Sequence, residues 1–143
     1  MGFGHNQMVL TNKGYALLKG KTGFFENNIK AFDEHLLKVG KRNYYKEYRL
    51  NDSHMVTLSM DNGISVTVSK DTELITAGPE LLFKTADKLT TTDDILCYSA
   101  FDSATFYARV KSVKPVTKGK NRIVISTKYP AIVNGVVLQG AKH

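Results

Sequence analysis

The stretch MVTLSMDNGISVTVSKDTELIT, from Met55 to Thr76, carries the clearest fold signal in this chain. Apolar and polar residues alternate along Met55–Met60 and again along Ile64–Ser69, as they do in half-buried β-strands. Between these runs lies Asp61-Asn62-Gly63, and an Asn-Gly step in such a place is a strong hairpin signal. We therefore expect two antiparallel strands, followed by a short third strand at Glu73–Thr76.

Alternation with a period of two and frequent turn residues continue along most of the chain. They predict an all-β domain of many short strands with at most one or two short helices. Further strands are expected at Gln7–Thr11, Tyr15–Leu18, Ile95–Ser99, Thr105–Val113, Arg122–Thr127 and Ile132–Leu138. We expect the last two of these strands to pair with each other, and Phe83–Leu89 to form a helical turn or an extended link.

One segment fits two kinds of secondary structure. Phe25, Ile29, Phe32 and Leu36 follow helical spacing after a possible helix cap at Thr22. This spacing favours a short helix. The alternative is a strand at residues 29–33 followed by a polar turn.

The composition suits one globular domain over residues 1–143, because 42% of the 143 residues are hydrophobic. No apolar run approaches the roughly 20 residues that a membrane helix needs. The N-terminus MGFGHNQ lacks the basic lead and apolar core of a secretory signal, and Asn6 stands where N-myristoylation needs Ser or Thr. We expect a soluble protein that is not secreted through a signal peptide and does not bind a membrane.

The formal charge of +7 permits attraction to nucleic acid, anionic lipid or an acidic protein. In Lys38–Arg49, aromatic and basic residues interleave. The candidate nucleic-acid contacts there are Arg42, Lys46 and Arg49, with Tyr44, Tyr45 and Tyr48 as stacking residues. A half-buried strand with aromatics inward and charges outward would have the same sequence, and we prefer that interpretation.

The other candidate reactive residues favour neither catalysis nor a metal site. Cys97 is the only cysteine, which excludes an intramolecular disulfide, and its apolar surroundings predict a buried, inert thiol. His35 and His54 lie in polar stretches that suit a solvated surface. The dipeptide His5-Asn6 lies near the N-terminus, and we do not expect it to act as a catalytic pair. We therefore expect no cofactor and no metal.

Five short motifs follow one another in an informative order: MVLTNKGY at Met8–Tyr15, VSKDTELIT at Val68–Thr76, TADKL at Thr85–Leu89, TDDIL at Thr92–Leu96 and NGVVLQG at Asn134–Gly140. Their order and spacing resemble the Hint domain of inteins and hedgehog autoprocessing proteins, over about residues 7–140. The resemblance implies a horseshoe of short β-strands.

The resemblance also implies where the self-cleaving chemistry of that family would lie. Gly2 matches the nucleophile, Ser69 and Thr72 match the Thr and His of a T-x-x-H motif, Tyr129 matches an upstream histidine, and Gln139 and Gly140 match the closing His and Asn. Ser69 retains a hydroxyl able to donate a hydrogen bond. The other positions lack the side chain that the reaction needs. We therefore expect no enzymatic activity.

A second resemblance concerns the biological setting. The opening GHNQMVLTNKGYALL resembles the start of phage tail and baseplate proteins. The chain begins with Met and ends three residues beyond the closing motif, so we expect a freestanding domain. Together these features suggest a structural component of a phage neck, collar or tail, which would bind other protein subunits in the virion or the host cytoplasm. The alternatives are an autoprocessing intein-like protein, natural or inactivated, and a basic nucleic-acid-binding protein.

Overall fold

The computed structural model describes residues 3–4, 7–11, 14–17, 23–33, 38–52, 54–78, 82–116, 120–126 and 130–139. Side chains are described for residues 3, 7–11, 14–17, 30–32, 54–78, 82–116 and 130–139. The strands are β1 (Phe3–Gly4), β2 (Val9–Thr11), β3 (Gly14–Ala16), β4 (Gly23–Asp33), β5 (Lys38–Asp52), β6 (Met55–Met60), β7 (Ser65–Ser69), β8 (Glu73–Thr76), β9 (Leu82–Thr85), β10 (Asp94–Ser99), β11 (Ala104–Pro115), β12 (Lys120–Ser126), β13 (Ala131–Val133) and β14 (Val136–Leu138). One 3-10 turn, η1 (Ala86–Lys88), follows β9.

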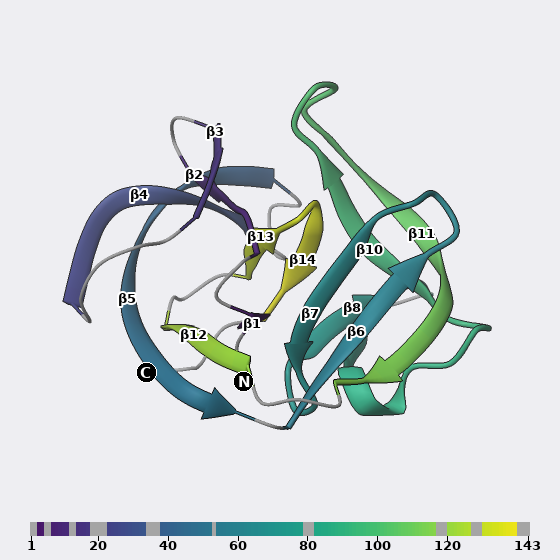
Figure 1. Ribbon diagram of the computed structural model, residues 1–143. Coiled ribbons are helices and arrows are strands. Elements are labelled where there is room, and N and C mark those ends of the chain that lie inside the picture. Colours follow the sequence, from purple (N-terminus) through teal and green to yellow (C-terminus); the bar gives the residue numbers. More distant parts are fainter. Residues whose placement is uncertain are drawn as a thin grey trace.

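Within the described residues, these strands form one curled antiparallel sheet in the order β3-β2-β13-β4-β5-β12-β1-β7-β6-β11-β10-β14-β8-β9. The long strands β4 and β5 curve around one side, and the hairpins β6–β7 and β10–β11 form the other side (Figure 1). The hairpin β13–β14 joins the two sides, because β13 pairs with β2 and β4 while β14 pairs with β8 and β10. The all-β prediction is confirmed.

The expected central hairpin is present. β6 and β7 pair from Met55↔Ser69 to Ser59↔Ser65. The Met60 amide donates to the Ile64 carbonyl at 2.8 Å, which closes a loop over residues 61–63. Gly63 has a φ of +90°, a conformation that glycine adopts without steric cost. The loop therefore belongs to the three-residue class with glycine in the left-handed position.

The predicted pairing of Arg122–Thr127 with Ile132–Leu138 is wrong. β13 and β14 instead pair with each other across a two-residue turn, with Val133 opposite Val136. Asn134 and Gly135 have φ values of +49° and +82°, as a type I′ turn requires. This turn folds residues 131–138 back on themselves, and β12 pairs with β5 and β1.

The predicted helix that begins near Phe25 is also wrong, because the segment forms β4. The alternative strand at residues 29–33 is confirmed, and Thr22 and Leu36 lie outside the described residues. Phe25 pairs with Tyr44 and Ile29 with Arg42, so β4 advances four residues where β5 advances two. The spacing that suggested a helix belongs to an irregular, bulged strand that pairs with β5 on both sides of the bulge.

Buried side chains of the curled sheet form two apolar clusters. The larger one gathers residues from β1, β2, β6, β7, β8, β10, β11, β13 and β14, including Phe3, Leu58, Val68 and Ile95. The smaller one includes Leu10, Phe32 and Ile132. No helix of the described residues is long and apolar enough to cross a membrane.

The burial of Leu58 in the central hairpin should contribute strongly to stability, which a matched pair of leucine truncations tests. Leu58 in β6 is fully buried, whereas Leu82 in β9 is 54% exposed. Leu58→Ala should lower the free energy of unfolding by about 2–5 kcal/mol, because it removes buried methyl groups and leaves a cavity. Leu82→Ala should change it by less than about 1 kcal/mol. Urea unfolding of both variants measures this, and equal losses would contradict the core assignment.

The acid limb of stability should depend on Asp93, which accepts hydrogen bonds from the Thr90 amide at 2.9 Å and the Lys84 ammonium at 3.0 Å. Burial raises the pKa of Asp93, but these bonds outweigh it and hold the pKa below its ordinary value of 3.8. The stabilising contribution is therefore complete above pH 3.8 and is lost as the pH falls through the lowered folded-state pKa.

The variant Asp93→Asn removes this titration while keeping the shape of the side chain. Unfolding free energies measured from about pH 5 to about pH 2 should fall less steeply for the variant than for the unmodified protein. If the free energy of unfolding depended on pH equally in both proteins, Asp93 would contribute nothing to the loss of stability in acid.

Candidate functional site

The site implied by the family resemblance centres on the turn between β7 and β8. The Thr72 amide donates to the Ser69 carbonyl at 3.1 Å, which closes a turn over residues 69–72. Both side chains are 1% exposed, and their hydroxyl oxygens lie 2.7 Å apart. The turn thus brings together the two side chains that match the ends of the T-x-x-H motif.

The hydrogen bonds of this turn have a definite direction. Ser69 Oγ donates to Asp71 Oδ1 at 2.8 Å, and a hydroxyl has a single proton to give. In the 2.7 Å contact between the hydroxyls, Thr72 must therefore be the donor and Ser69 the acceptor. The sequence-based expectation that Ser69 is able to donate needs refinement, because its proton is already bound by Asp71.

Asp71 remains an acceptor at neutral pH. Burial raises the pKa of its carboxyl group, but hydrogen bonds, including the one from Ser69, outweigh burial and lower the pKa below its ordinary value. An ionised carboxylate has no proton to return to Ser69. We therefore describe Thr72, Ser69 and Asp71 as a hydroxyl relay in which each proton points toward the carboxylate.

Neighbouring backbone groups hold the relay in place on two sides. The Ala86 amide at the start of η1 donates to the Thr72 carbonyl at 2.8 Å. The Asp87 amide donates to the Lys70 carbonyl at 3.1 Å, and the Lys70 amide donates to the His54 carbonyl at 3.0 Å. The motif at residues 85–89 therefore acts here as a support for the turn.

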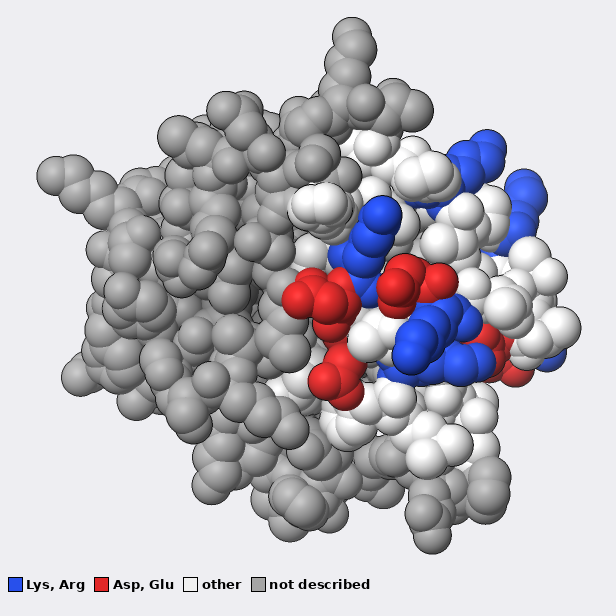
Figure 2. Space-filling model, turned by 90° about the horizontal axis from the view of Figure 1, so that it is seen from below, with Lys and Arg blue, Asp and Glu red and all other residues white. Residues whose placement is uncertain are grey.

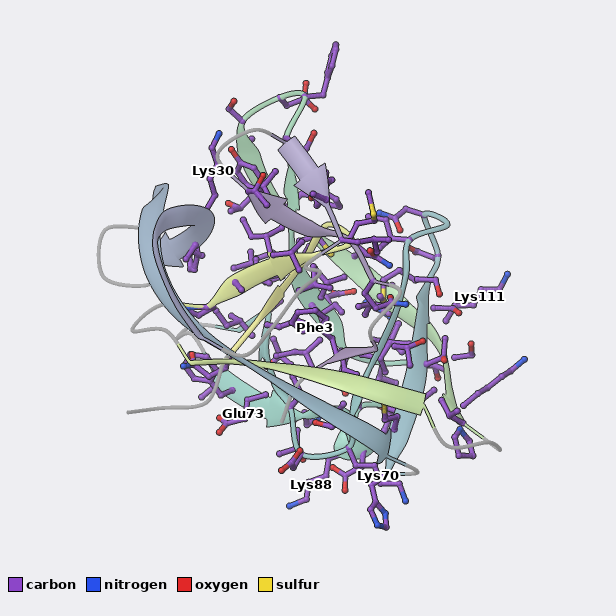
Figure 3. The ribbon with its side chains drawn as sticks, turned by 60° about the vertical axis from the view of Figure 1, so that its left-hand side comes forward. Phe3, Lys30, Lys70, Glu73, Lys88 and Lys111 are labelled. Carbon is purple, nitrogen blue, oxygen red and sulfur yellow. The ribbon has the colours of Figure 1, made fainter. Side chains whose placement is uncertain are left out.

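Two further parts of the chain meet beside the relay. Phe3 of β1 pairs with Val68, the residue directly before Ser69. Gln139 follows β14, is 6% exposed, and its amide donates to the Glu73 carbonyl at 2.9 Å, next to Thr72. Figure 3 shows Phe3 in the interior and Glu73 toward one end of the molecule. The structure thus brings the β1 segment, the relay and the end of β14 into one region.

Several residues singled out in the sequence lie outside the described part of the chain. They are Gly2, His5, Asn6, His35, Tyr129 and Gly140. Their places in the site remain predictions.

The remaining candidate reactive residues, Cys97 and His54, differ in burial. Cys97 is fully buried in the larger core cluster, as predicted, and desolvation raises the pKa of its thiol to about 12. His54 is exposed. Among the described residues, no group of three or more His, Cys, Asp or Glu side chains gathers as metal ligands do.

The basic residues Arg42, Lys46 and Arg49 all belong to β5, where they lie opposite Ile29, Ile125 and Arg122. Their side chains are outside the described set, so their use as nucleic-acid contacts stays a prediction. On the face seen in Figure 2, the described acidic and basic side chains are interspersed. This described surface is therefore no single positive patch of the kind that follows a phosphate backbone.

Sequence reasoning missed the role of Asp71. The family positions directed attention to residues 69 and 72, whereas the carboxylate lies between them. The available signal was local: a serine or threonine hydroxyl often bonds to a group two residues further on in a turn.

The structural comparisons identify the fold. No protein-family model and no curated protein matches the sequence. Among solved structures, the chain is similar to the PabCDC21-1 intein, with a TM-score of 0.79, 12% identity and 98% of each chain covered. A DnaB intein from Synechocystis sp. PCC 6803 gives 0.78, 12% and 98% of each chain, and the TvoVMA intein gives 0.76, 16% and 98% of each chain. At this identity the likeness concerns the fold, and the chain has the Hint fold of inteins.

Proposed function

We propose that this chain is a Hint-fold domain that does not cleave or splice itself and that serves a structural or protein-interaction role. The observation that carries the proposal is the hydroxyl relay. At the place where the family's T-x-x-H histidine would lie, Thr72 donates its proton to Ser69, and Ser69 donates to Asp71.

The relay is chemically unsuited to the role of that histidine. In the Hint domains that this chain resembles, that histidine positions or protonates the scissile peptide nitrogen. Proton delivery at neutral pH needs a group that titrates in that range, and a threonine hydroxyl does not. In addition, both hydroxyl protons are already engaged, that of Thr72 by Ser69 Oγ and that of Ser69 by Asp71 Oδ1. The side-chain amide of Gln139, at the position of the closing histidine, does not titrate either.

A sheet with exposed edges suits an interaction role. In the described sheet order, β3 and β9 are the terminal strands, and β9 carries Leu82 and Phe83 at 54% and 38% exposure. Such edges can accept a strand from a partner. The N-terminal resemblance to phage tail and baseplate proteins supports a place among the protein subunits of a phage neck, collar or tail, in the virion or the host cytoplasm.

The proposal predicts that the chain leaves its flanking peptide bonds intact. The test is a fusion of the chain between two inert reporter domains, incubated overnight with and without a thiol nucleophile. Intact-mass spectrometry should return the full mass in both conditions. Release of either reporter would contradict the proposal, and the fragment masses would locate the reactive bond.

A second prediction concerns restoration of the missing histidine. Thr72→His in the same fusion should leave the mass unchanged, because an imidazole alone supplies no nucleophile and no cyclising asparagine. Lys70→His, an exposed position in the same turn, is the matched control. Circular dichroism should verify that both variants remain folded. Cleavage by the Thr72→His variant alone would show that the rest of the reactive machinery is present.

A further inference from the structure

The positive charge of this chain is distributed unevenly. Among the residues whose side chains the structure describes, seven Lys and Arg balance seven Asp and Glu. The formal excess of +7 therefore lies in the other residues. Lys38–Arg49 of β5 alone contains five basic residues and one acidic residue, and residues 103–143 contain eight basic residues and no acidic one. Charge concentrated in this way indicates an anionic partner.

The fold brings these two basic stretches side by side, because β12 pairs with β5. The register places Arg122 directly opposite Arg49. On the other side of β5, Lys30 of β4 lies directly opposite Lys41. Directly opposite residues of neighbouring strands lie on the same face of the sheet, with Cβ atoms about 4.5–5.5 Å apart. The sheet therefore contains two pairs of closely spaced cationic residues.

These two pairs are unfavourable for the chain by itself, because like charges directly opposite each other destabilise a sheet. The same ladders pair opposite charges at other places, Asp33 with Lys38 and Asp52 with Lys120. An anion bound by both cations of a pair would replace their repulsion with two attractions. The like-charge pairs thus become favourable when an anion is bound.

Arg49 and Arg122 lie on the face of the sheet that is opposite to the larger core cluster. Phe3 is 3% exposed, belongs to that cluster and lies opposite Ile123 of β12. Ile123 is therefore on the core face, and Arg122, its neighbour in the same strand, is on the outer face. Arg49 shares the outer face because it lies opposite Arg122.

Lys30 and Lys41 lie on the same outer face. Ala31 is buried in the larger core cluster, so its neighbour Lys30 lies on the other side of β4. Lys30 is half-buried, and Figure 3 shows its side chain extending away from Phe3. Two residues along, Phe32 belongs to the smaller core cluster, which closes the outer face at this end.

An aromatic pair lies between the two cation pairs. Lys41, Tyr45 and Arg49 are spaced four residues apart in β5, and such residues share a face of a strand. Tyr45 lies opposite Phe24 of β4. We call these positions the basic face, and in order along β5 they are Lys41 with Lys30, Tyr45 with Phe24, and Arg49 with Arg122. The basic face spans roughly 27 Å, the length of eight residues of extended strand.

We propose that the basic face binds single-stranded nucleic acid, with phosphates held at the two cation pairs and a base stacked at Tyr45 and Phe24. Proteins that bind single strands combine cations along the backbone with aromatic rings on which bases stack, and their sites span about 4–16 nucleotides. The inference goes beyond the proposed function and is tested separately, since it concerns a bound polyanion and not peptide cleavage.

The aromatic pair favours a single strand over other polyanions. A polyanion without bases would be bound by the cations alone. A duplex keeps its base faces stacked inside, whereas the unstacked bases of a single strand can lie against aromatic rings. Cations and aromatic residues on one face also exceed what a half-buried strand requires, because such a strand needs aromatic residues only on its core face.

The first experiment follows the fluorescence anisotropy of a labelled single strand of about 16 nucleotides as the chain is added. Affinity should fall roughly 50-fold between about 50 and 200 mM salt, the loss expected for about four phosphate contacts on a single strand. Arg49→Glu should weaken binding roughly tenfold or more and reduce the salt dependence.

Lys70→Glu is the matched control for this experiment. It makes the same change in net charge at an exposed residue of the surface where acidic and basic side chains are interspersed (Figure 2), so affinity should change less than about threefold. Absent binding at the lower salt concentration, binding that does not depend on salt, or equal losses in the two variants would overturn the proposal.

The second experiment separates binding from folding. Arg49→Glu puts opposite charges in register with Arg122, so the urea midpoint of unfolding should rise while the affinity falls. Arg122→Glu should have the same two effects from the other strand. Glu47→Gln should strengthen binding, because it removes the acidic residue two positions before Arg49. A lower midpoint in both arginine variants would refute the like-charge pairing on which the proposal rests.

The third experiment tests for stacked bases. Tyr45→Leu should weaken binding of the single strand roughly fivefold or more but leave binding of inorganic polyphosphate unchanged. Phe24→Leu should give the same contrast, and circular dichroism should verify that both variants are folded. A bromouridine-substituted strand should crosslink under ultraviolet light to peptides containing Phe24 or Tyr45. Equal losses for both polyanions, tighter binding of a duplex of the same length, or crosslinks elsewhere would contradict a single strand on the basic face.

Discussion

The backbone hydrogen bonding of the β13–β14 hairpin is the constraint on which the rest of this structure depends. Two three-residue strands bond to each other and to β2, β4, β8 and β10, and so join both sides of the curled sheet. Buried backbone amides and carbonyls need hydrogen-bond partners. Detaching these two short strands from the sheet would therefore leave such groups unpaired on four neighbouring strands. The type I′ turn at Asn134 and Gly135 makes this arrangement possible, because positive φ values at both central residues give the turn a twist that matches its flanking strands.

The same hairpin positions the candidate site. β14 delivers Gln139 beside Glu73, and β1 delivers Phe3 beside Val68. The relay of Thr72, Ser69 and Asp71 lies between them. Its two hydroxyls are buried and bonded, which suits a structural turn at least as well as a reactive one. The fold thus gathers three distant parts of the chain around one buried, fully bonded turn.

Local features of the fold were readable in the sequence, and long-range ones were not. The step at Asn62 and Gly63 predicted its hairpin because both strands and the turn are contiguous. Asn134 and Gly135 are also an Asn-Gly step, yet the apolar run on both sides of them predicts one strand paired with residues 122–127, where the chain instead turns back on itself. The apolar residues of the bulged strand β4 have helical spacing, because two residues four positions apart share a face both in a helix and in a strand. Asn134 bonds to Gln7 across 127 residues, a contact that no local pattern contains.

The two Asn-Gly steps should also differ in their chemical stability. In this dipeptide the glycine nitrogen can attack the asparagine side-chain carbonyl, and asparagine is accordingly among the thermolabile residues. Asn62 is exposed at a hairpin tip, and its side-chain oxygen accepts a hydrogen bond from the nearby Ile64 amide at 3.1 Å. Asn134 has its side chain held at both ends by Met8, Gln7 and Ser65. We therefore expect this reaction to begin at Asn62. Asn134 is protected, because the hydrogen bonds that fix its turn also hold its side chain in place.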